Sequence, residues 1–471
     1  MRTPAEAFHS LYGKIRREWR LAFLSCFLAG LLVHMPMLLA DIPNHDGLDS
    51  LYFDQNMITS GRWFLTVACG FSSYYTIPWL IGLLGLVFLG ITAAVICELL
   101  EVRKGWAVVL CSTMLAVFPA LASTFAYVYT LDGYMLAMLL AAAAVLFTAK
   151  YRLGFLPGGV CLAFSLGIYQ GYLSFAMILS VFAVWRTLDQ AAGESGKEKG
   201  RWTKILGYPA MGITGAVLYF VILQILLRLQ GKTLAAYQGI DTMTGGTQGG
   251  GFISRMLEMV RDFFSFTLKG NVLFQNVFSA TALCVLAGTA AAAVVFRIRS
   301  RKYWKNPLIF GIMILTVPVL PLVTNIVLLI SPDVNYHLLM RYQWVLYLMG
   351  AVALAAGCGE KAPRRAWMEW GALLGAAVLV FCYSVTDNIA YSNLQKRYEK
   401  TYAYCVRLLD RIEQTEGYYP GIPIAMVGVV GEEQYPITDI TLPVTGGMIG
   451  MNGDSLLYTG RNYQLFIRNY L

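Results

Sequence analysis

The chain has 471 residues, of which 57% are hydrophobic and only 13% are charged. A soluble protein carries about 25% charged residues, so this composition excludes a soluble enzyme built from several domains. The net charge of +9 does not indicate nucleic-acid binding, because the basic residues gather at the ends of apolar stretches, where they set the orientation of membrane spans.

The apolar stretches predict an all-α polytopic membrane protein. They are continuous rather than alternating, which favours helices over a β-barrel. The basic N-terminus precedes a first span that we interpret as uncleaved. The weakest assignments, 153–169 and 171–187, have about 17 residues each and could instead form one broken helix. The sequence predicts about eleven spans, at residues 21–40, 77–99, 105–125, 131–149, 153–169, 171–187, 205–229, 272–296, 307–330, 342–358 and 368–386.

The distribution of basic residues predicts the orientation of the spans. Segments assigned to the inner side are rich in Lys and Arg, whereas the short outer segments contain only Arg62 and Arg341. The positive-inside rule therefore predicts a multi-pass protein of the cell membrane, with a cytoplasmic N-terminus and an extracytoplasmic C-terminal segment.

Motifs of cofactor-dependent enzymes are absent from the sequence. It contains no P-loop, GxGxxG, HExxH or CxxC pattern, and we interpret the nine cysteines as small core residues. The inner loops are too short to hold a nucleotide-binding domain. We therefore predict no cofactor, no metal and no nucleic-acid partner.

The first external loop, residues 41–76, contains an unusual density of polar residues. Treated as a short helix, its 48–59 segment separates Asp49 and Asp54 by roughly 140°, whereas Asp46 and Asp49 can converge. A single cation, Arg62, follows between Gly61 and Trp63. The loop carries four acids within 14 positions, namely Asp41, Asp46, Asp49 and Asp54.

Asp46 and Asp49 are the predicted catalytic residues. A carboxylate within hydrogen-bond reach can take the proton of an acceptor hydroxyl, and a second can stabilise oxocarbenium-like charge. The structural alternative is helix capping, which also favours Asp. Asp54 is a candidate substrate-binding residue. Arg62 could bind the phosphate of a lipid-linked donor, or anchor the loop at the interface beside Trp63.

Further polar residues lie at the outer ends of other spans. Asp132, Tyr169 and Gln170 could bind a sugar by hydrogen bonding and stacking. Arg341 is a second phosphate candidate, with His337 one turn before it as a substrate-binding candidate. For each of these residues taken alone, a structural role is the favoured alternative.

Two longer segments are predicted to be external. Residues 230–270 combine a glycine-rich stretch with an amphipathic helix, and form either a lid or a plain connector. Residues 387–471 form a predicted α/β cap, with a charged helix over 388–416 and a buried strand from Gly421. The rest of the chain, residues 1–386, is the predicted transmembrane domain.

The first loop and one later motif resemble a known family. NHDGLDSLYFDQNMITSGRW and, more weakly, SLGIYQGYLSF resemble the type II bacterial glucosyltransferases (Gtr type II) of the GT-C superfamily. Asp46 and Asp49 fall where the acids of that loop fall, and Arg62 falls in its SGRW-like element. The resemblance implies inverting transfer of a sugar, typically glucose, from a polyprenyl-phosphate donor to a cell-surface glycan. A donor synthase and a flippase would then act in the same pathway.

Two other classes of protein fit the same sequence features. A transporter or flippase of lipid-linked sugars would share the topology, and a polysaccharide polymerase or ligase would share the donor. Ion-coupled transporters place ionisable residues near the bilayer midplane. Here the centres of the spans are nearly free of charge, which favours an enzyme at the outer interface.

Overall fold

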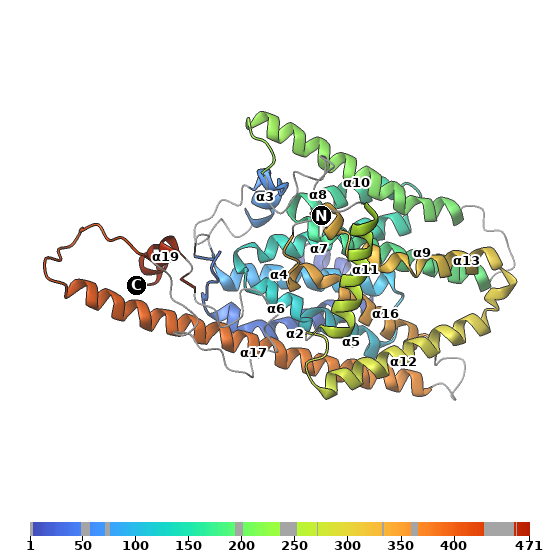
Figure 1. Cartoon of the computed structure of the whole chain (residues 1–471). Coiled ribbons are helices and arrows are strands. Elements are labelled where there is room, and N and C mark those ends of the chain that lie inside the picture. The colour runs from blue at the N-terminus through green and yellow to red at the C-terminus, as the bar shows by residue number, and fades with distance from the viewer. Residues whose placement is uncertain are drawn as a thin grey trace.

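The protein is a helical bundle, described here from a computed structural model (Figure 1). The structure describes residues 3–48, 57–70, 76–193, 201–235, 252–270, 272–331, 334–358, 366–427, 456–457 and 459–471. Over these residues β structure is limited to one bridge, between Met57 and Arg62. This agrees with the expected all-α architecture.

Eight helices are long and apolar enough to cross a membrane, and a bent pair makes a ninth span within the described residues. The pair is α5 (Gly105–Val117) and α6 (Pro119–Phe125), which meet at 41° because Pro119 cannot continue the ladder of α5. The eight candidates are α2 (Arg17–Leu39), α4 (Pro78–Leu99), α7 (Leu131–Lys150), α9 (Leu173–Gly193), α10 (Arg201–Leu229), α12 (Val277–Ser300), α16 (Val345–Ala356, extended by the preceding 3-10 helix) and α17 (Ala366–Glu413).

Two of the predicted spans are short or broken in the structure. The segment 153–169 forms α8 (Phe155–Ile168), which packs between α7 and α10. The segment 307–330 is divided into α13 (Pro307–Thr316), α14 (Val319–Thr324) and α15 (Val327–Ile330), and contains Pro318 and Pro321. The predicted number of eleven spans therefore stays a prediction.

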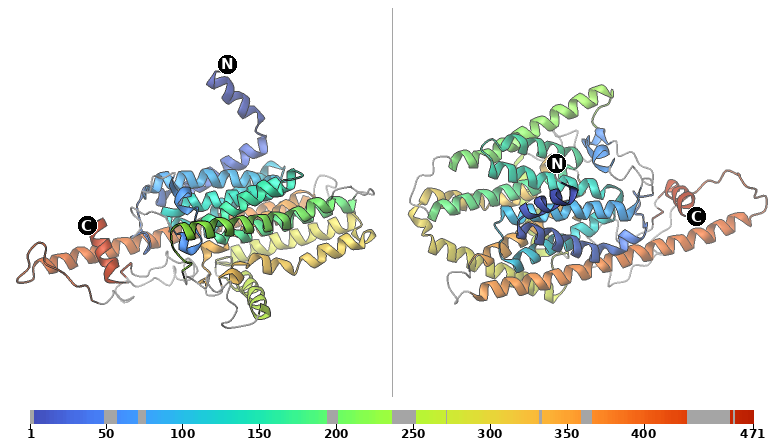
Figure 2. Two further views of the ribbon diagram at one scale, coloured as in Figure 1. Left: turned by 90° about the horizontal axis from the view of Figure 1, so that it is seen from above. Right: turned by 180° about the vertical axis from the view of Figure 1, so that it is seen from behind.

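The core of the bundle forms where small residues let helices approach closely. Leu86 of α4 lies against Gly30 of α2, and Leu38 of α2 lies against Gly82 of α4. A side chain at either glycine would separate the two helices, as expected for packing in a membrane. The N-terminal helix α1 (Pro4–Lys14) projects away from this bundle (Figure 2).

Helix α11 (Phe252–Lys269) runs across the direction of the bundle helices (Figure 1). Only Met259 of this helix is buried, and several large apolar side chains are exposed, including Phe252, Ile253 and Leu257. The predicted amphipathic helix in the 230–270 segment is thus confirmed as a helix, while residues 236–251 lie outside the described part.

Within its described residues, the C-terminal segment contains helices and turns but no strand. The predicted charged helix is the second half of α17, which continues the last span without a break and extends past the bundle (Figure 1). Residues 421–427 form no strand, and the rest of the predicted strand lies outside the described residues. The chain ends in α19 (Gly460–Tyr470), which lies beside α17 in both figures.

Candidate functional site

Arg62 follows a tight turn in the first loop. A 3-10 helix, η1 (Ile58–Ser60), ends at Gly61, whose φ of +78° is favourable only for glycine. The Arg62 N–H donates to the Met57 carbonyl at 3.1 Å and closes the turn. The backbone thereby fixes the direction in which the arginine side chain leaves the loop.

Two side chains from other helices hold this turn. Gln170 Nε2 donates to the Ser60 carbonyl at 3.1 Å and to Tyr219 Oη at 3.0 Å. The Tyr219 hydroxyl in turn donates to the Gly61 carbonyl at 3.1 Å. These bonds tie the turn to α10 and to the start of α9, so Gln170 both supports Arg62 and lies in the same site.

The next residues of the loop are inserted into the bundle. The Phe64 N–H donates to the Gly167 carbonyl at 2.7 Å. The Trp63 ring covers Gly167 so closely that a Cβ there would lie 2.6 Å from it. The SGRW element is therefore anchored on both sides of Arg62.

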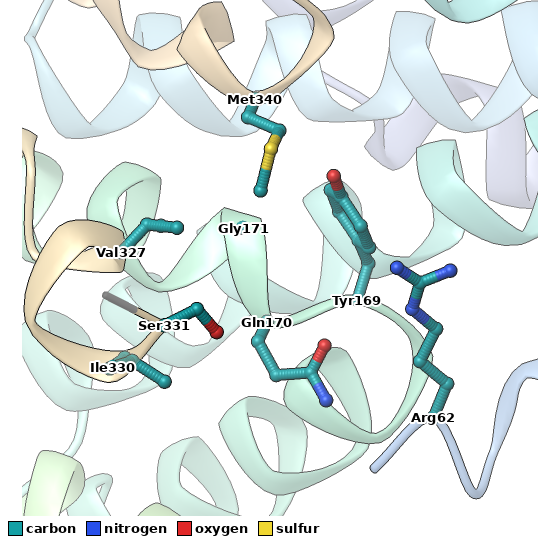
Figure 3. Close-up of a pocket in the computed structure, with 8 residues that line it drawn as sticks. All are labelled: Arg62, Tyr169, Gln170, Gly171, Val327, Ile330, Ser331 and Met340. Atoms are coloured by element: carbon teal, nitrogen blue, oxygen red, sulfur yellow. The ribbon is translucent and has the colours of Figure 1, made fainter. Parts of the chain in front are cut away.

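A pocket opens where the Arg62 turn faces the segment before α16 (Figure 3). The cavity is small, about 20 Å³, and it is partly open to solvent. One wall carries a cation, an aromatic ring and an amide, and the other is mostly apolar. Its lining residues are Arg62, Tyr169, Gln170, Gly171, Val327, Ile330, Ser331 and Met340.

Aromatic rings support the polar wall of this pocket. The Arg62 guanidinium lies over the Tyr169 ring, 5.2 Å from its centroid. Tyr169 stacks on Tyr134 at 4.5 Å and contacts Tyr172 edge-on at 5.6 Å. Because Tyr169 is only 5% exposed, its ring is a fixed surface rather than a mobile one.

Asp46 does not line the pocket, but it is close enough to act on side chains that Arg62 and Arg341 also affect. Its side chain is 54% exposed, and its Oδ1 lies 3.5 Å from His45 Nε2. Tyr129 is within electrostatic reach of both Asp46 and Arg62. An accessible carboxylate and an arginine thus occur together, while Asp49 and Asp54 lie outside the described residues.

His337 belongs to the same group of side chains. Burial lowers its pKa, and the nearby His45 and Arg341 lower it further, while Asp46 partly offsets the shift. The imidazole is therefore neutral at neutral pH. A neutral imidazole here can accept or donate a hydrogen bond to a substrate hydroxyl.

Arg341 is bound by another side chain of the protein. Its Nη1 and Nη2 donate to Asp262 of α11 at 2.6 Å and 2.8 Å. The Tyr336 ring lies 3.8 Å from the guanidinium carbon, and Asn325 donates to Asp262 at 3.1 Å. The fork that was predicted to bind a phosphate is thus occupied by a carboxylate.

Asp132 is fully buried in the first turn of α7. Its Oδ1 accepts a hydrogen bond from the Gly133 N–H at 2.8 Å, and it also interacts with the Cys69 thiol. It does not line the pocket. Within the described residues, no three His, Cys, Asp or Glu side chains gather in a way that could hold a metal ion.

Tyr219 and Asp262 were not predicted from the sequence. Both are ordinary residues of their helices, and their importance comes from partners far along the chain. The hydroxyl of Tyr219 is separated from Gly61 by 158 positions. A weak signal existed for Asp262, since it is one of two acids on an amphipathic helix otherwise rich in Phe and Met.

The fold and this site define a multi-pass membrane protein with an arginine, an aromatic platform and an acid at one end of its bundle. Residues 35–355 match the family described as glucosyl transferase GtrII. The match covers more than half of the chain, so the protein belongs to this family and is a membrane glycosyltransferase with a sugar donor and a glycan acceptor. No curated protein and no solved structure matches it.

Proposed function

We propose that the protein transfers glucose from a polyprenyl-phosphate donor to a cell-surface glycan at the outer face of the cytoplasmic membrane. The observation that carries this proposal is that an exposed acid, Asp46, and the pocket residue Arg62 are both within electrostatic reach of Tyr129. In such a reaction the attacking hydroxyl loses a proton and the leaving phosphate gains negative charge. An acid can accept the proton, and a cation can stabilise the phosphate. The lipid tail of the donor suits a site at the end of a membrane bundle.

In the proposed reaction, the acceptor hydroxyl attacks the anomeric carbon of the donor sugar in a single inverting step. The bond from that carbon to the phosphate oxygen breaks, and the phosphate leaves with the bonding electrons. Asp46 takes the proton of the attacking hydroxyl. Arg62 stabilises the charge that develops on the leaving phosphate. Atoms and charges balance without a cofactor.

We assign the phosphate role to Arg62 rather than to Arg341. The Arg341 fork already holds Asp262, and breaking such a pair costs several kcal/mol, typically about 3. Arg62 instead lies on the pocket wall, and its turn is fixed by Gln170 and Tyr219. A preorganised cation costs no rearrangement during the reaction.

The remaining side chains of the site fit recognition of the sugar. The Tyr169 ring, stacked on Tyr134 and lying under the Arg62 guanidinium, supports the polar wall that a sugar would meet. Gln170 and Ser331 offer hydrogen-bonding groups on the pocket wall. We place His337 near the bound acceptor glycan, because the charge of Asp46 affects the pKa of His337. Asp49 stays the second candidate for the base, as predicted from the sequence.

The test uses purified protein in detergent with labelled undecaprenyl-phosphate glucose and cell-envelope glycan. We expect transfer by the native chain, loss of kcat in Asp46→Asn, and loss of donor binding in Arg62→Ala. Asp410→Asn and Arg407→Ala are matched controls, since both residues are exposed on the far part of α17. Normal transfer by Asp46→Asn and loss in Asp49→Asn would assign the base to Asp49. Normal transfer by both and by Arg62→Ala would reject this site.

A further inference from the structure

The C-terminal helix α19 packs on the first loop. Leu48, two residues after Asp46, is only 1% exposed. It belongs to a small apolar cluster that is separate from the bundle core, and all other buried members of the cluster come from α17 or from the C-terminal end. These members are Cys405, Leu456, Leu457, Tyr463 and Phe466.

Two polar contacts accompany this packing. Asn469 Nδ2 donates to the Leu48 carbonyl at 3.3 Å. The Tyr470 hydroxyl donates to Asp41 Oδ2 at 3.4 Å. The two contacts lie at the two ends of the segment 41–48, so consecutive residues of α19 bracket the part of the loop that carries Asp46.

Helix α19 is itself fixed to the long helix that continues the last span. Tyr398 of α17 contacts Phe466 at 5.9 Å and Tyr470 at 5.7 Å between ring centroids. The N-terminus of α19 is capped by Thr459, whose hydroxyl accepts the Asn462 N–H. The contacts to the loop are therefore made from a rigid support rather than from a loose terminus.

We propose that α19 is a positioning element for the catalytic base, and that Asn469 and Tyr470 hold the segment 41–48 so that Asp46 faces the Arg62 pocket. The proposal rests on the proposed function. It concerns a part of the chain beyond the residues that match the family, which end at position 355. The C-terminal helix thus supplies a support for the active site that the matched region lacks.

The physical reason is the geometric demand of proton transfer. A general base must lie within hydrogen-bond reach of the hydroxyl that it deprotonates, and a small displacement is costly. Asp46 itself is about half exposed, and the contacts of α19 fall on Asp41 and Leu48, at the two ends of the segment that carries it. The Arg62 turn is held separately by Gln170 and Tyr219. Losing the α19 contacts should therefore impair chemistry and spare donor binding.

The test compares the native protein with the double variant Asn469→Ala/Tyr470→Phe, which removes both polar contacts and keeps the ring that packs on α17. We expect kcat to fall about tenfold, as for two lost hydrogen bonds that position a base, with an unchanged KM for the donor. The control is Gln464→Ala/Arg468→Ala, which alters the exposed face of the same helix and should leave both constants unchanged.

Hydrogen exchange of peptides from residues 40–48 provides a second measurement that needs no substrate. Faster exchange in the double variant, but not in the control, supports the positioning role. Unchanged exchange overturns it, as does an unchanged kcat or an equal effect on kcat and KM with a lowered melting temperature. Absence of transfer by the native chain would reject the proposed function instead, and the exchange measurement would still decide whether α19 restrains the loop.

Discussion

Substitution of Gly61 should disrupt the site through the backbone. At its φ of +78°, an alanine costs about 1–2 kcal/mol. The added Cβ would lie 2.6 Å from Gln170 Nε2 and closer still to Tyr219 Oη, so at least one of the hydrogen bonds that hold the turn must break. One such bond contributes about 1 kcal/mol.

The two effects together amount to about 2–3 kcal/mol in the stability of the turn that carries Arg62. At 1.36 kcal/mol for each factor of ten, kcat/KM for donor transfer should fall about 30- to 150-fold in Gly61→Ala. The assay is transfer of labelled glucose at subsaturating donor, with the melting temperature in detergent recorded for the same preparation. Adding Tyr219→Phe removes the clashing hydroxyl and should restore part of the loss.

Gly231 offers a matched control, because it also has a positive φ, of +61°, but a Cβ there would meet nothing within 4 Å. Gly231→Ala introduces backbone strain without touching Gln170 or Tyr219, so its transfer rate should stay near the native value. The reasoning is refuted if Gly61→Ala transfers glucose as fast as Gly231→Ala.

Three further outcomes are expected. Asp262→Asn leaves the largely buried Arg341 without its counter-charge and should lower stability by about 3 kcal/mol, seen as a lower melting temperature that Asp262→Glu largely avoids. The pKa of His337 is lowered in the folded protein, so the unfolded chain binds the proton more readily and stability falls as the pH drops below about 6.5; in His337→Gln this loss should be smaller. Gly167→Ala would push a Cβ into the Trp63 ring, and should lower the transfer rate while the melting temperature stays near the native value. A clearly lowered melting temperature would instead indicate a general packing defect.

The positions of most spans could be predicted from the sequence because a membrane helix needs a long apolar stretch, and length is visible in one dimension. Where a helix is interrupted within an apolar stretch, the length of the stretch does not reveal the interruption. The segment 307–330 is as apolar as a span, yet the structure divides it into three short helices, with Pro318 directly before the second. Whether such a segment crosses the membrane depends on its neighbours.

Part of the site could also be predicted. Arg62, Tyr169 and Gln170 were predicted as candidates because polar residues are conspicuous beside apolar spans. The structure places all three on one pocket wall, and their roles stay predictions. The ion pair of Arg341 with Asp262 was not foreseen, because the two residues are 79 positions apart and only packing of α11 against the bundle joins them. For the same reason the sequence did not reveal that Leu48 is covered by α19 rather than by lipid.

The central claim is that the Arg62 pocket transfers a sugar rather than moving a lipid-linked sugar across the bilayer. The most direct measurement follows, in one reaction, the labelled glucose that becomes attached to glycan and the polyprenyl monophosphate that is released. We expect equal molar amounts of the two products from the native protein and neither product from Arg62→Ala. Labelled glucose that crosses a proteoliposome membrane while still attached to its lipid, with no monophosphate released, would contradict it.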